Sequence, residues 1–311
     1  MPDAADATMS NGIFVRPEFV HESLGAAGHG EVARRLTMVE RVTNIEPLRK
    51  FSILIFVIVA WELYTTVWDV PELMFPTFSD TFAALIDAVV NGGLLENVWN
   101  SISVLFKGYV IGIGIAAVLV VLGVTTRFGD DLLTTLTAML NPLPAIALLP
   151  MAMLWFGLGE NAIIFTLLHS IIWPVALNTH VGFKSVSETL RAVGQNYNLR
   201  GIVFIAKILI PAAFPAILTG LRIGWAFAWR TLIAAELVFG GQVQDTSGQL
   251  GAEGSNSGGL GWIIFQNQME NQTPYVFAGL FTVIMVGIVI ENVVFRNLED
   301  RTVRKWGMQQ A

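Results

Sequence analysis

Ionisable and aromatic side chains interrupt the long apolar stretches of this 311-residue chain. Arg230 lies near the middle of one stretch, just after Trp225 and Trp229. A charge at the centre of a membrane helix costs about 2.5–3.5 kcal/mol on insertion scales, so it marks either a buried ion pair or contact with a charged solute. A guanidinium beside aromatic rings suits a small organic anion. Both roles stand for Arg230, and the structural ion pair is the simpler one.

Two acids are candidates for the same polar interior. Glu62 lies in the outer half of the first apolar stretch, where it can pair with Arg230 or with Lys107. Glu236 follows Arg230 by six residues and points to another helical face. Arg222 lies nearer one end of its stretch and is expected to reach the membrane surface or to pair with lipid phosphate. The predicted polar route comprises Glu62, Trp225, Trp229, Arg230 and Glu236, although packing against neighbours or lipid is the commoner fate of tryptophan.

The composition places the chain in a membrane and excludes several kinds of chemistry. Hydrophobic residues make up 54% and charged residues 14% of the chain, against about 25% charged in soluble domains. The absence of cysteine excludes disulfides and thiol nucleophiles. The four histidines lack ligand spacing, so neither a metal site nor a bound cofactor is expected. No GxxxxGKS/T motif for binding ATP occurs, no nucleic-acid partner is expected, and the N-terminus lacks the pattern of a cleavable signal peptide.

Six apolar runs predict six transmembrane helices. Each has about the 20 residues that cross a bilayer core of about 30 Å, and hydrocarbon leaves the backbone no alternative to the helix. The runs cover 51–68, 103–125, 133–156, 162–180, 212–239 and 273–295. The predicted fold is therefore an all-α polytopic membrane protein. An N-terminal extension (1–50) with an amphipathic helix at 31–42 precedes the membrane domain (51–295), and a tail (296–311) follows it.

The distribution of lysine and arginine predicts the orientation. The segment before the first run, alternate loops and the tail contain the bases outside the apolar runs. The three remaining loops, which include the Gly/Ser-rich segment 242–261, contain nine acids and no base. Because basic loops stay on the cytoplasmic side, both termini are expected in the cytoplasm.

One cytoplasmic loop, residues 187–211, has a helical pattern of its own. Leu190, Val193 and Tyr197 recur near helical spacing, and Asn198 and Gly201 interrupt the pattern. The sequence predicts a short helix, a turn at 198–201, and a second helix that leads to Pro211. Such a loop suits docking to a partner protein.

At this loop the chain resembles the permease subunits of bacterial ABC importers. Their signature reads Glu-Ala-Ala, three residues, Gly, nine residues, Ile, any residue and Leu-Pro. Its spacing is kept here by Ala192-Val193-Gly194, Asn198, Ile208 and Ile210-Pro211, while the leading Glu and central Gly are absent. Glu188 is the nearest acid, and Asn tolerates the left-handed conformation that a Gly would adopt. The resemblance implies a coupling helix at about 187–199 and docking residues Glu188, Arg191, Ala192, Val193, Gly194, Tyr197, Asn198 and Pro211.

Further segments are similar to the nitrate/sulfonate/taurine branch of these permeases. They are NPLPAIALLPMAMLWFGLGE (141–160), GLRIGWAFAWRTLIAAELVFG (220–240), GLGW (259–262) and RTVRKWGM (301–308). The resemblance covers about residues 50–308. It implies a type I ABC importer fold and a non-enzymatic transport subunit in the bacterial inner membrane. The implied partners are a second copy of the chain, two ATPases that bind ATP and Mg²⁺, a periplasmic or lipid-anchored solute-binding protein, and membrane lipid.

The substrate and two rival classes stay open at this point. A sulfonate, taurine or nitrate fits the branch, whereas related permeases carry bicarbonate, vitamin precursors or aromatic acids. The acidic outer loops would repel a free anion, which favours delivery by a binding protein. A stand-alone transporter or channel would require internal repeats or a chain of proton carriers. A membrane-bound enzyme would require clustered ligands, and the one acidic pair, Asp130-Asp131, is expected to cap a helix.

Overall fold

The computed structural model of the protein describes residues 46–239 and 258–305. The chain divides into two units, residues 1–57 and 58–311. Helix α2 (Glu46–Val67) begins in the first unit and ends in the second, which holds all the contacts discussed below. The helix expected at 31–42 and most of the Gly/Ser-rich segment 242–261 lie outside the described residues.

Four unbroken helical segments of the described chain are long and apolar enough to cross a membrane. They are Leu48–Val67, Leu94–Thr125, Glu160–Lys184 and Thr273–Arg304. The second and third are helices α4 and α7. The fourth joins α13 (Thr273–Val289), η4 (Ile290–Phe295), α14 (Arg296–Glu299) and η5 (Asp300–Arg304). Four of the six predicted spans are thus confirmed as continuous helical segments.

The third predicted span is not one helix. Helix α5 (Arg127–Leu140) ends before a turn, and η2 (Ala145–Leu148) and α6 (Leu149–Phe156) follow at an angle of 91° to it. Pro142 and Pro144 lie in the turn, where their rings prevent a continuous ladder of backbone hydrogen bonds. The prediction of a single span at 133–156 is corrected to a broken span or a re-entrant pair.

The fifth predicted span is α11 (Phe214–Phe239), and the expected helical loop precedes it. That loop comprises α8 (Glu188–Asn196), α9 (Gly201–Phe204), η3 (Ile205–Leu209) and α10 (Ile210–Ala212). The segment 201–212 meets α11 at 80°. Pro211 lies near the end of this uninterrupted helical run, directly after η3, and has no N–H to donate within it.

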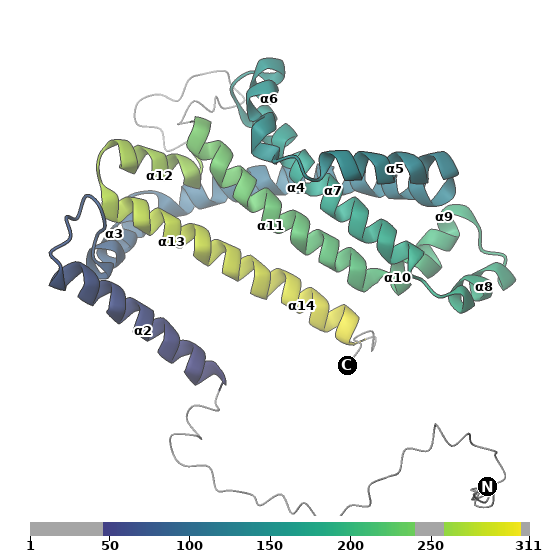
Figure 1. Ribbon diagram of the computed structural model, residues 1–311, viewed down its shortest axis with the longest axis horizontal. Coiled ribbons are helices and arrows are strands. Elements are labelled where there is room, and N and C mark those ends of the chain that lie inside the picture. Colours follow the sequence, from purple (N-terminus) through teal and green to yellow (C-terminus); the bar gives the residue numbers. More distant parts are fainter. Residues whose placement is uncertain (1–45, 240–257, 306–311) are drawn as a thin grey trace, which may run out of the picture. The chain divides into compact units, whose positions relative to one another are not determined.

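Helix α7 forms the centre of the packed bundle. It packs against α4 on one side and α11 on the other, and Figure 1 shows α7 and α11 running side by side. Leu105, Leu167 and Leu232, one from each helix, are fully buried in the shared core. The core therefore holds together the three helices that carry most of the polar residues described below.

Glycines let these helices approach closely. A Cβ atom added at Gly112 of α4 would lie 2.8 Å from Ile171 of α7, and one added at Gly224 of α11 would lie 3.1 Å from Val175. Association in a membrane depends on such contacts, because lipid is as apolar as the side chains. Small residues thus set the spacing of α4, α7 and α11.

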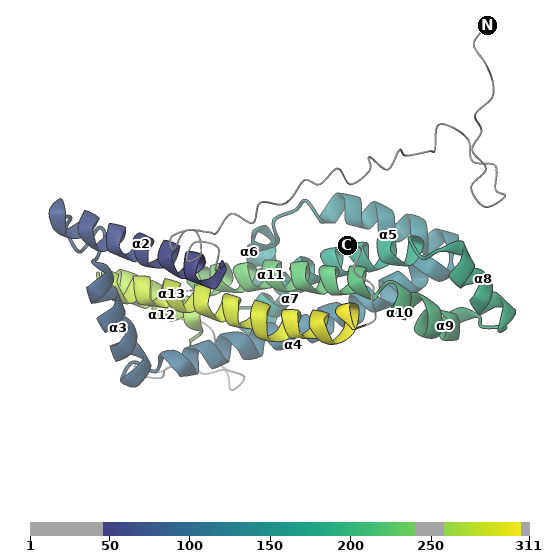
Figure 2. The same ribbon diagram turned by 90° about the horizontal axis from the view of Figure 1, so that it is seen from below.

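The two ends of the bundle carry different short helices. Helix α12 (Leu260–Met269) packs against the C-terminal part of α11 and against α13, whereas α8 and α9 lie beyond the N-terminal part of α11 (Figure 2). Helix α3 (Phe78–Val90) is on the side of α12, packed against α13. Helices α8 and α12 therefore lie at opposite ends of the bundle.

Candidate functional site

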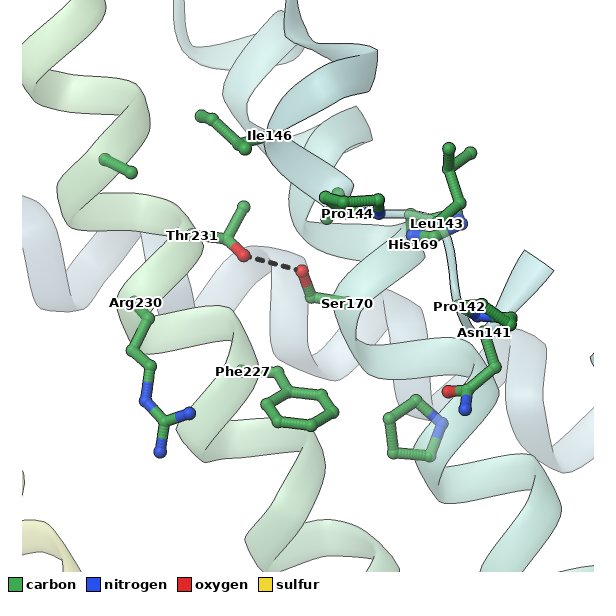
Figure 3. A pocket seen from close by; sticks show the side chains of 13 residues that line it. Asn141, Pro142, Leu143, Pro144, Ile146, His169, Ser170, Phe227, Arg230 and Thr231 are labelled. Atoms are coloured by element: carbon green, nitrogen blue, oxygen red, sulfur yellow. Dashed lines mark hydrogen bonds between the residues drawn. The ribbon is translucent and has the colours of Figure 1, made fainter.

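A cavity of about 340 Å³ opens beside the middle of α11. The turn between α5 and η2 forms one wall, and residues of α7 and α11 form the others (Figure 3). The lining comprises Asn141, Pro142, Leu143, Pro144, Ala145, Ile146, His169, Ser170, Pro174, Phe227, Arg230, Thr231 and Ala234. The broken α5–α6 pair thus has a definite place in the structure, as the wall of a cavity inside the membrane domain.

Arg230 brings a positive charge to this cavity. Its guanidinium carbon lies 5.8 Å from the centre of the Phe227 ring, an attractive cation–π arrangement. Within residues 46–239 and 258–305 it forms no ion pair, and its side chain is exposed. The expected pairing of Arg230 with a buried acid is therefore absent from the described structure.

The lining of the cavity is mostly apolar but includes a few neutral polar side chains. Ser170 of α7 and Thr231 of α11 are joined through their hydroxyl groups over 2.8 Å (Figure 3). His169 Nε2 is buried and has no hydrogen-bond partner in the described part of the chain. Sequence reasoning missed these residues, because a lone serine, threonine or histidine in an apolar helix has no spacing signal. An anion held by Arg230 would thus have neutral donors within the same cavity.

The two tryptophans predicted beside Arg230 lie elsewhere. Trp229 is buried in the core with 7% of its surface exposed. Trp225 packs edge-on against Tyr109, with ring centres 5.4 Å apart, and also against Phe295. Neither belongs to the lining of the Arg230 cavity. Packing against neighbours, the alternative considered for both, describes their position.

Glu236 joins three helices at the end of α11 opposite α8. It is 4% exposed, and its carboxylate accepts hydrogen bonds from Ser101 Oγ at 2.7 Å and from Gly261 N–H at 2.7 Å. Ser101 Oγ in turn accepts from Leu260 N–H at 2.7 Å. The carboxylate thus satisfies the first turn of α12, whose N–H groups have no partners within the helix. Glu236 holds backbone in place and does not line the Arg230 cavity.

The other intramembrane charges also have local partners. Glu62 accepts from the backbone N–H and hydroxyl of Ser79, at 3.1 and 2.7 Å, so it caps the start of α3. Lys107 pairs with Glu160 over 2.7 Å. The pairs considered for Glu62, with Arg230 or Lys107, are therefore not formed.

Arg222 departs from its expected contact with the membrane surface. Its guanidinium pairs with Glu291 at 3.0 Å and with Glu299 at 2.9 Å. Both acids lie in the C-terminal segment, so the pairs fasten that segment to the first half of α11. The lipid-phosphate contact expected for Arg222 is corrected to a bridge between helices.

Helix α8 is held to the end of α7. The Ser187 hydroxyl accepts from Leu190 N–H and caps α8, while Arg191 donates to the main-chain carbonyls of Phe183 and Val186. Those carbonyls lie at the end of α7 and just beyond it, and the Phe183 carbonyl also accepts from Val186 N–H at 3.4 Å. Arg191 thus sets the position of α8 against the bundle.

The turn after α8 has the predicted backbone. Asn198 has φ of 55° and Gly201 has φ of 56°, both in the left-handed region. A Cβ atom added at Gly194 would lie 2.6 Å from the Phe204 ring, so this glycine lets α8 pack on the segment that follows. The short helix, turn and second helix expected at 187–211 are confirmed.

One face of α8 is apolar and open. Leu190, Val193 and Tyr197 are 44%, 41% and 77% exposed, which is unusual for side chains of this kind at the end of a compact bundle. Glu188 and Ala192 are exposed as well. Of the residues predicted to dock a partner, Glu188, Ala192, Val193, Tyr197 and Asn198 are exposed, whereas Gly194 is buried and Arg191 and Pro211 are half-buried.

A further polar cluster escaped the sequence analysis. Asp130 accepts from His180 Nε2 and from Lys184 Nζ, both at 2.7 Å, and so ties the start of α5 to the end of α7. The cap of α5 is Thr126, whose hydroxyl accepts from Gly129 N–H. The helix-capping role expected for Asp130 is thus corrected. The spacing of four between His180 and Lys184 was the available signal, since it places both on one helical face.

Comparison with known proteins identifies a family model that matches residues 108–304, described as "Binding-protein-dependent transport system inner membrane component". The match covers more than half of the chain and contains both α8 and the Arg230 cavity. It therefore spans the chain from the middle of α4 to the end of η5.

Individual relatives agree with this match. A Methanocaldococcus jannaschii protein named as an ABC transporter permease is 28% identical over 84% of this chain and 93% of its own length. A Bacillus subtilis protein named for aliphatic sulfonates transport is 26% identical over 80% of this chain and 84% of its own length. The nitrate import permease of a Synechocystis strain is 29% identical over 65% of this chain and 69% of its own length.

Proposed function

The chain belongs to the family of inner-membrane components of binding-protein-dependent transport systems, and from this premise we propose that it forms the pathway of an ATP-driven importer for a small anion. Within the family it falls in the branch whose relatives are named for aliphatic sulfonates, nitrate and taurine. It is a multi-pass membrane transport subunit and not an enzyme. The chemistry of the Arg230 cavity supports an anionic substrate.

The exposed Arg230 in a membrane cavity carries the proposal of an anionic substrate. A guanidinium without an acid partner in the described chain is stabilised when an oxyanion takes that place. The Phe227 ring and the prolines of the α5–η2 turn offer an apolar surface for a short carbon chain. An aliphatic sulfonate uses both features, and nitrate uses the first.

Uptake into proteoliposomes tests this assignment. The chain, its ATPase and its binding protein are reconstituted together, and ATP-driven uptake of labelled ethanesulfonate, nitrate and taurine is compared. A hydrogen bond between charged groups contributes about 1.5–3 kcal/mol, so Arg230→Gln should lower uptake of the true substrate about ten- to hundredfold, while Arg230→Lys retains part of it.

Lys107→Gln is the matched control, because Lys107 is an intramembrane base outside the Arg230 cavity. It should leave uptake within about twofold of the parent. Equal losses in the two Gln variants, or normal uptake by Arg230→Gln with all three anions, would contradict an anion contact at Arg230. Strong uptake of bicarbonate or an aromatic acid in their place would favour the alternative nutrients.

The proposed assembly contains two copies of this chain, two ATPases and a solute-binding protein. The apolar face of α8 supports an ATPase contact, with Leu190, Val193 and Tyr197 as the surface that is covered. Because the signature Glu is absent, the proposed contact relies on apolar packing, with Glu188 at its edge. Uptake by the chain alone, without an ATPase, would instead favour a stand-alone transporter.

The proposed orientation puts α8 and both termini in the cytoplasm. Lys184, Arg191, Arg200 and Lys207 lie at or beside the α8 end, as the positive-inside rule requires. Since the chain contains no cysteine, single variants such as Tyr197→Cys and Asn271→Cys can be labelled without background. A membrane-impermeant maleimide applied to intact cells should label the Asn271 variant only, and labelling of the Tyr197 variant would reverse the orientation.

A further inference from the structure

A second cavity, of about 310 Å³, lies at the α8 end of the bundle. The end of α4, the start of α5 and the end of α7 surround it, and α8 contributes Arg191. Its side chains include three bases, Arg127, Lys184 and Arg191, and one acid, Asp130. The cavity is separate from the Arg230 site, and the proposed transport route does not use it.

The charges of this cavity are only partly compensated. Lys184 is 2.7 Å from Asp130, which leaves the carboxylate neutralised. Arg191 donates to carbonyls, which carry no full charge. Arg127 is exposed and forms no ion pair or hydrogen bond through its guanidinium with the residues that the structure describes. Two positive charges therefore remain for an external anion.

A buried histidine fixes the position of the acid in this cavity, so the cavity is more than a group of surface bases. His180 is 3% exposed, its Nε2 is 2.7 Å from Asp130, and its Nδ1 is buried without a hydrogen-bond partner in the described chain. The histidine fixes the carboxylate against α7 and so keeps it on Lys184. Arg127, at the first position of the 14-residue helix α5, is left free beside the positive end of that helix dipole.

Exposed apolar side chains follow the same helices away from the cavity. Leu122 of α4, Phe128 of α5 and Val181 of α7 are 45%, 77% and 55% exposed. A basic cavity between helices at the cytoplasmic end, next to apolar surface, is the arrangement that holds an anionic headgroup while acyl chains cover the helices. A free phosphate would use the bases and leave the apolar surface unused.

We propose that this cavity binds the phosphodiester of an anionic membrane phospholipid, with Arg127 as its main contact and Lys184 and Arg191 at its edges. Because Arg191 also fixes α8 to α7, the bound lipid stabilises the geometry in which α8 is presented. The binding step stands on the cavity alone. The effect of the bound lipid on ATP-driven uptake rests on the proposed function, and it is measured in a separate experiment.

Native mass spectrometry of the full-length chain in detergent measures the binding step. The chain is titrated with phosphatidylglycerol, phosphatidylcholine or inorganic phosphate. A base near the membrane surface contributes about 1 kcal/mol toward an anionic lipid, so Arg127→Gln should weaken phosphatidylglycerol binding roughly fivefold. Arg127→Lys should restore most of it, which shows that the Gln variant is folded.

Lys207→Gln is the matched control, since it removes one base at the same end outside this cavity. Unchanged phosphatidylglycerol binding by Lys207→Gln supports a defined site. If Lys207→Gln weakened binding as much as Arg127→Gln, the attraction would be a general one to surface bases, and the proposal would be overturned. Displacement of phosphatidylglycerol by inorganic phosphate at similar concentration would assign a free-phosphate site. If Arg127→Gln bound phosphatidylglycerol normally but no longer bound the ATPase, these bases would belong to the contact with that partner protein.

A second readout follows the complete transporter in vesicles. Uptake per ATP hydrolysed should rise when phosphatidylglycerol replaces part of a phosphatidylcholine bilayer, and the rise should be absent in Arg127→Gln. Lipid binding without this rise would leave the site standing and overturn its effect on coupling.

Discussion

Glu236 and Gly261 meet over 2.7 Å, with the carboxylate of α11 accepting the N–H of the first turn of α12. A Cβ atom at Gly259 would lie 2.1 Å from the Glu236 carboxylate, and one at Gly261 would lie 2.6 Å from Glu236 Cβ. The short GLGW segment therefore has glycines where the acid needs room. The contact fixes the beginning of α12 to α11 and, through Ser101, to α4.

Truncating this acid should destabilise the bundle. Glu236→Ala leaves Ser101 and Gly261 N–H buried without their acceptor, which costs about 1–3 kcal/mol for each unsatisfied group. Thermal unfolding in detergent should show a clear fall in Tm, with a smaller fall for Glu236→Gln, which keeps one acceptor oxygen. Glu270→Ala, at the exposed end of α12, should change little. An unchanged Tm for Glu236→Ala would mean that the contact is unimportant.

Two glycines of α4 provide a matched test of helix packing. Gly112→Ala places a methyl group 2.8 Å from Ile171 and should cost about 1–3 kcal/mol as an overpacked contact. Gly114 has nothing within 4 Å of the added atom, so Gly114→Ala should be neutral or stabilise by up to about 1 kcal/mol through helix propensity. Unfolding midpoints of the two variants, measured side by side, give the comparison. A similar fall in both would indicate that the α4–α7 spacing adapts.

A charge on the open face of α8 should uncouple transport from ATP hydrolysis. Val193→Glu places a carboxylate in the surface expected to be covered, where burying an unpaired charge is unfavourable. Uptake should fall more than about tenfold, while membrane insertion and the folded bundle persist. Gln195→Glu adds the same charge to another face of α8 and should retain uptake. Normal uptake by Val193→Glu would remove α8 from the coupling role.

Asp87 should contribute stability that depends on pH. Side-chain hydrogen bonds from Asn91 and Tyr275 hold the pKa of Asp87 below its usual value, and the Tyr275 hydroxyl is 2.7 Å away. A lowered pKa means that this stabilisation is present above the usual pKa and is lost as the pH falls through the folded-state value. Tyr275→Phe should therefore lower Tm slightly at neutral pH and not in strong acid. If the Tm difference between Tyr275→Phe and the parent instead grew as the pH fell, this prediction would be wrong.

The elements of this fold were largely predictable, because apolar length and helical period depend on local sequence. The spans at α4, α7 and α13 and the left-handed Asn198 were foreseen in this way. The break at the α5–η2 turn was not. Prolines in an apolar run are compatible with a kinked span or with two helices, and only tertiary packing selects the 91° bend.

The partners of charged side chains were the least predictable part of the site. Arg222 pairs with Glu291 and Glu299, 69 and 77 residues away in sequence, and no periodicity connects them. Tryptophan is similarly ambiguous, since Trp229 is buried in the core although it precedes the exposed Arg230. The sequence alone marked Arg230 as a charge within an apolar helix. The cavity beside it could be found only from the structure, because residues of α7 and of the turn after α5 form its other walls.

Pro174 creates a weak point inside helix α7, ten residues before its end at Lys184. Pro174 has no N–H for the Ser170 carbonyl, so one hydrogen bond of the helix is absent at this point. From this weak point to Lys184 the helix extends about 15 Å at 1.5 Å per residue, so a swing of roughly 10° would displace the Lys184 end by about 2.6 Å. Such a swing would carry Lys184 and its partner Asp130, whereas His169 and Ser170, which line the Arg230 cavity, would stay on the other side of the pivot.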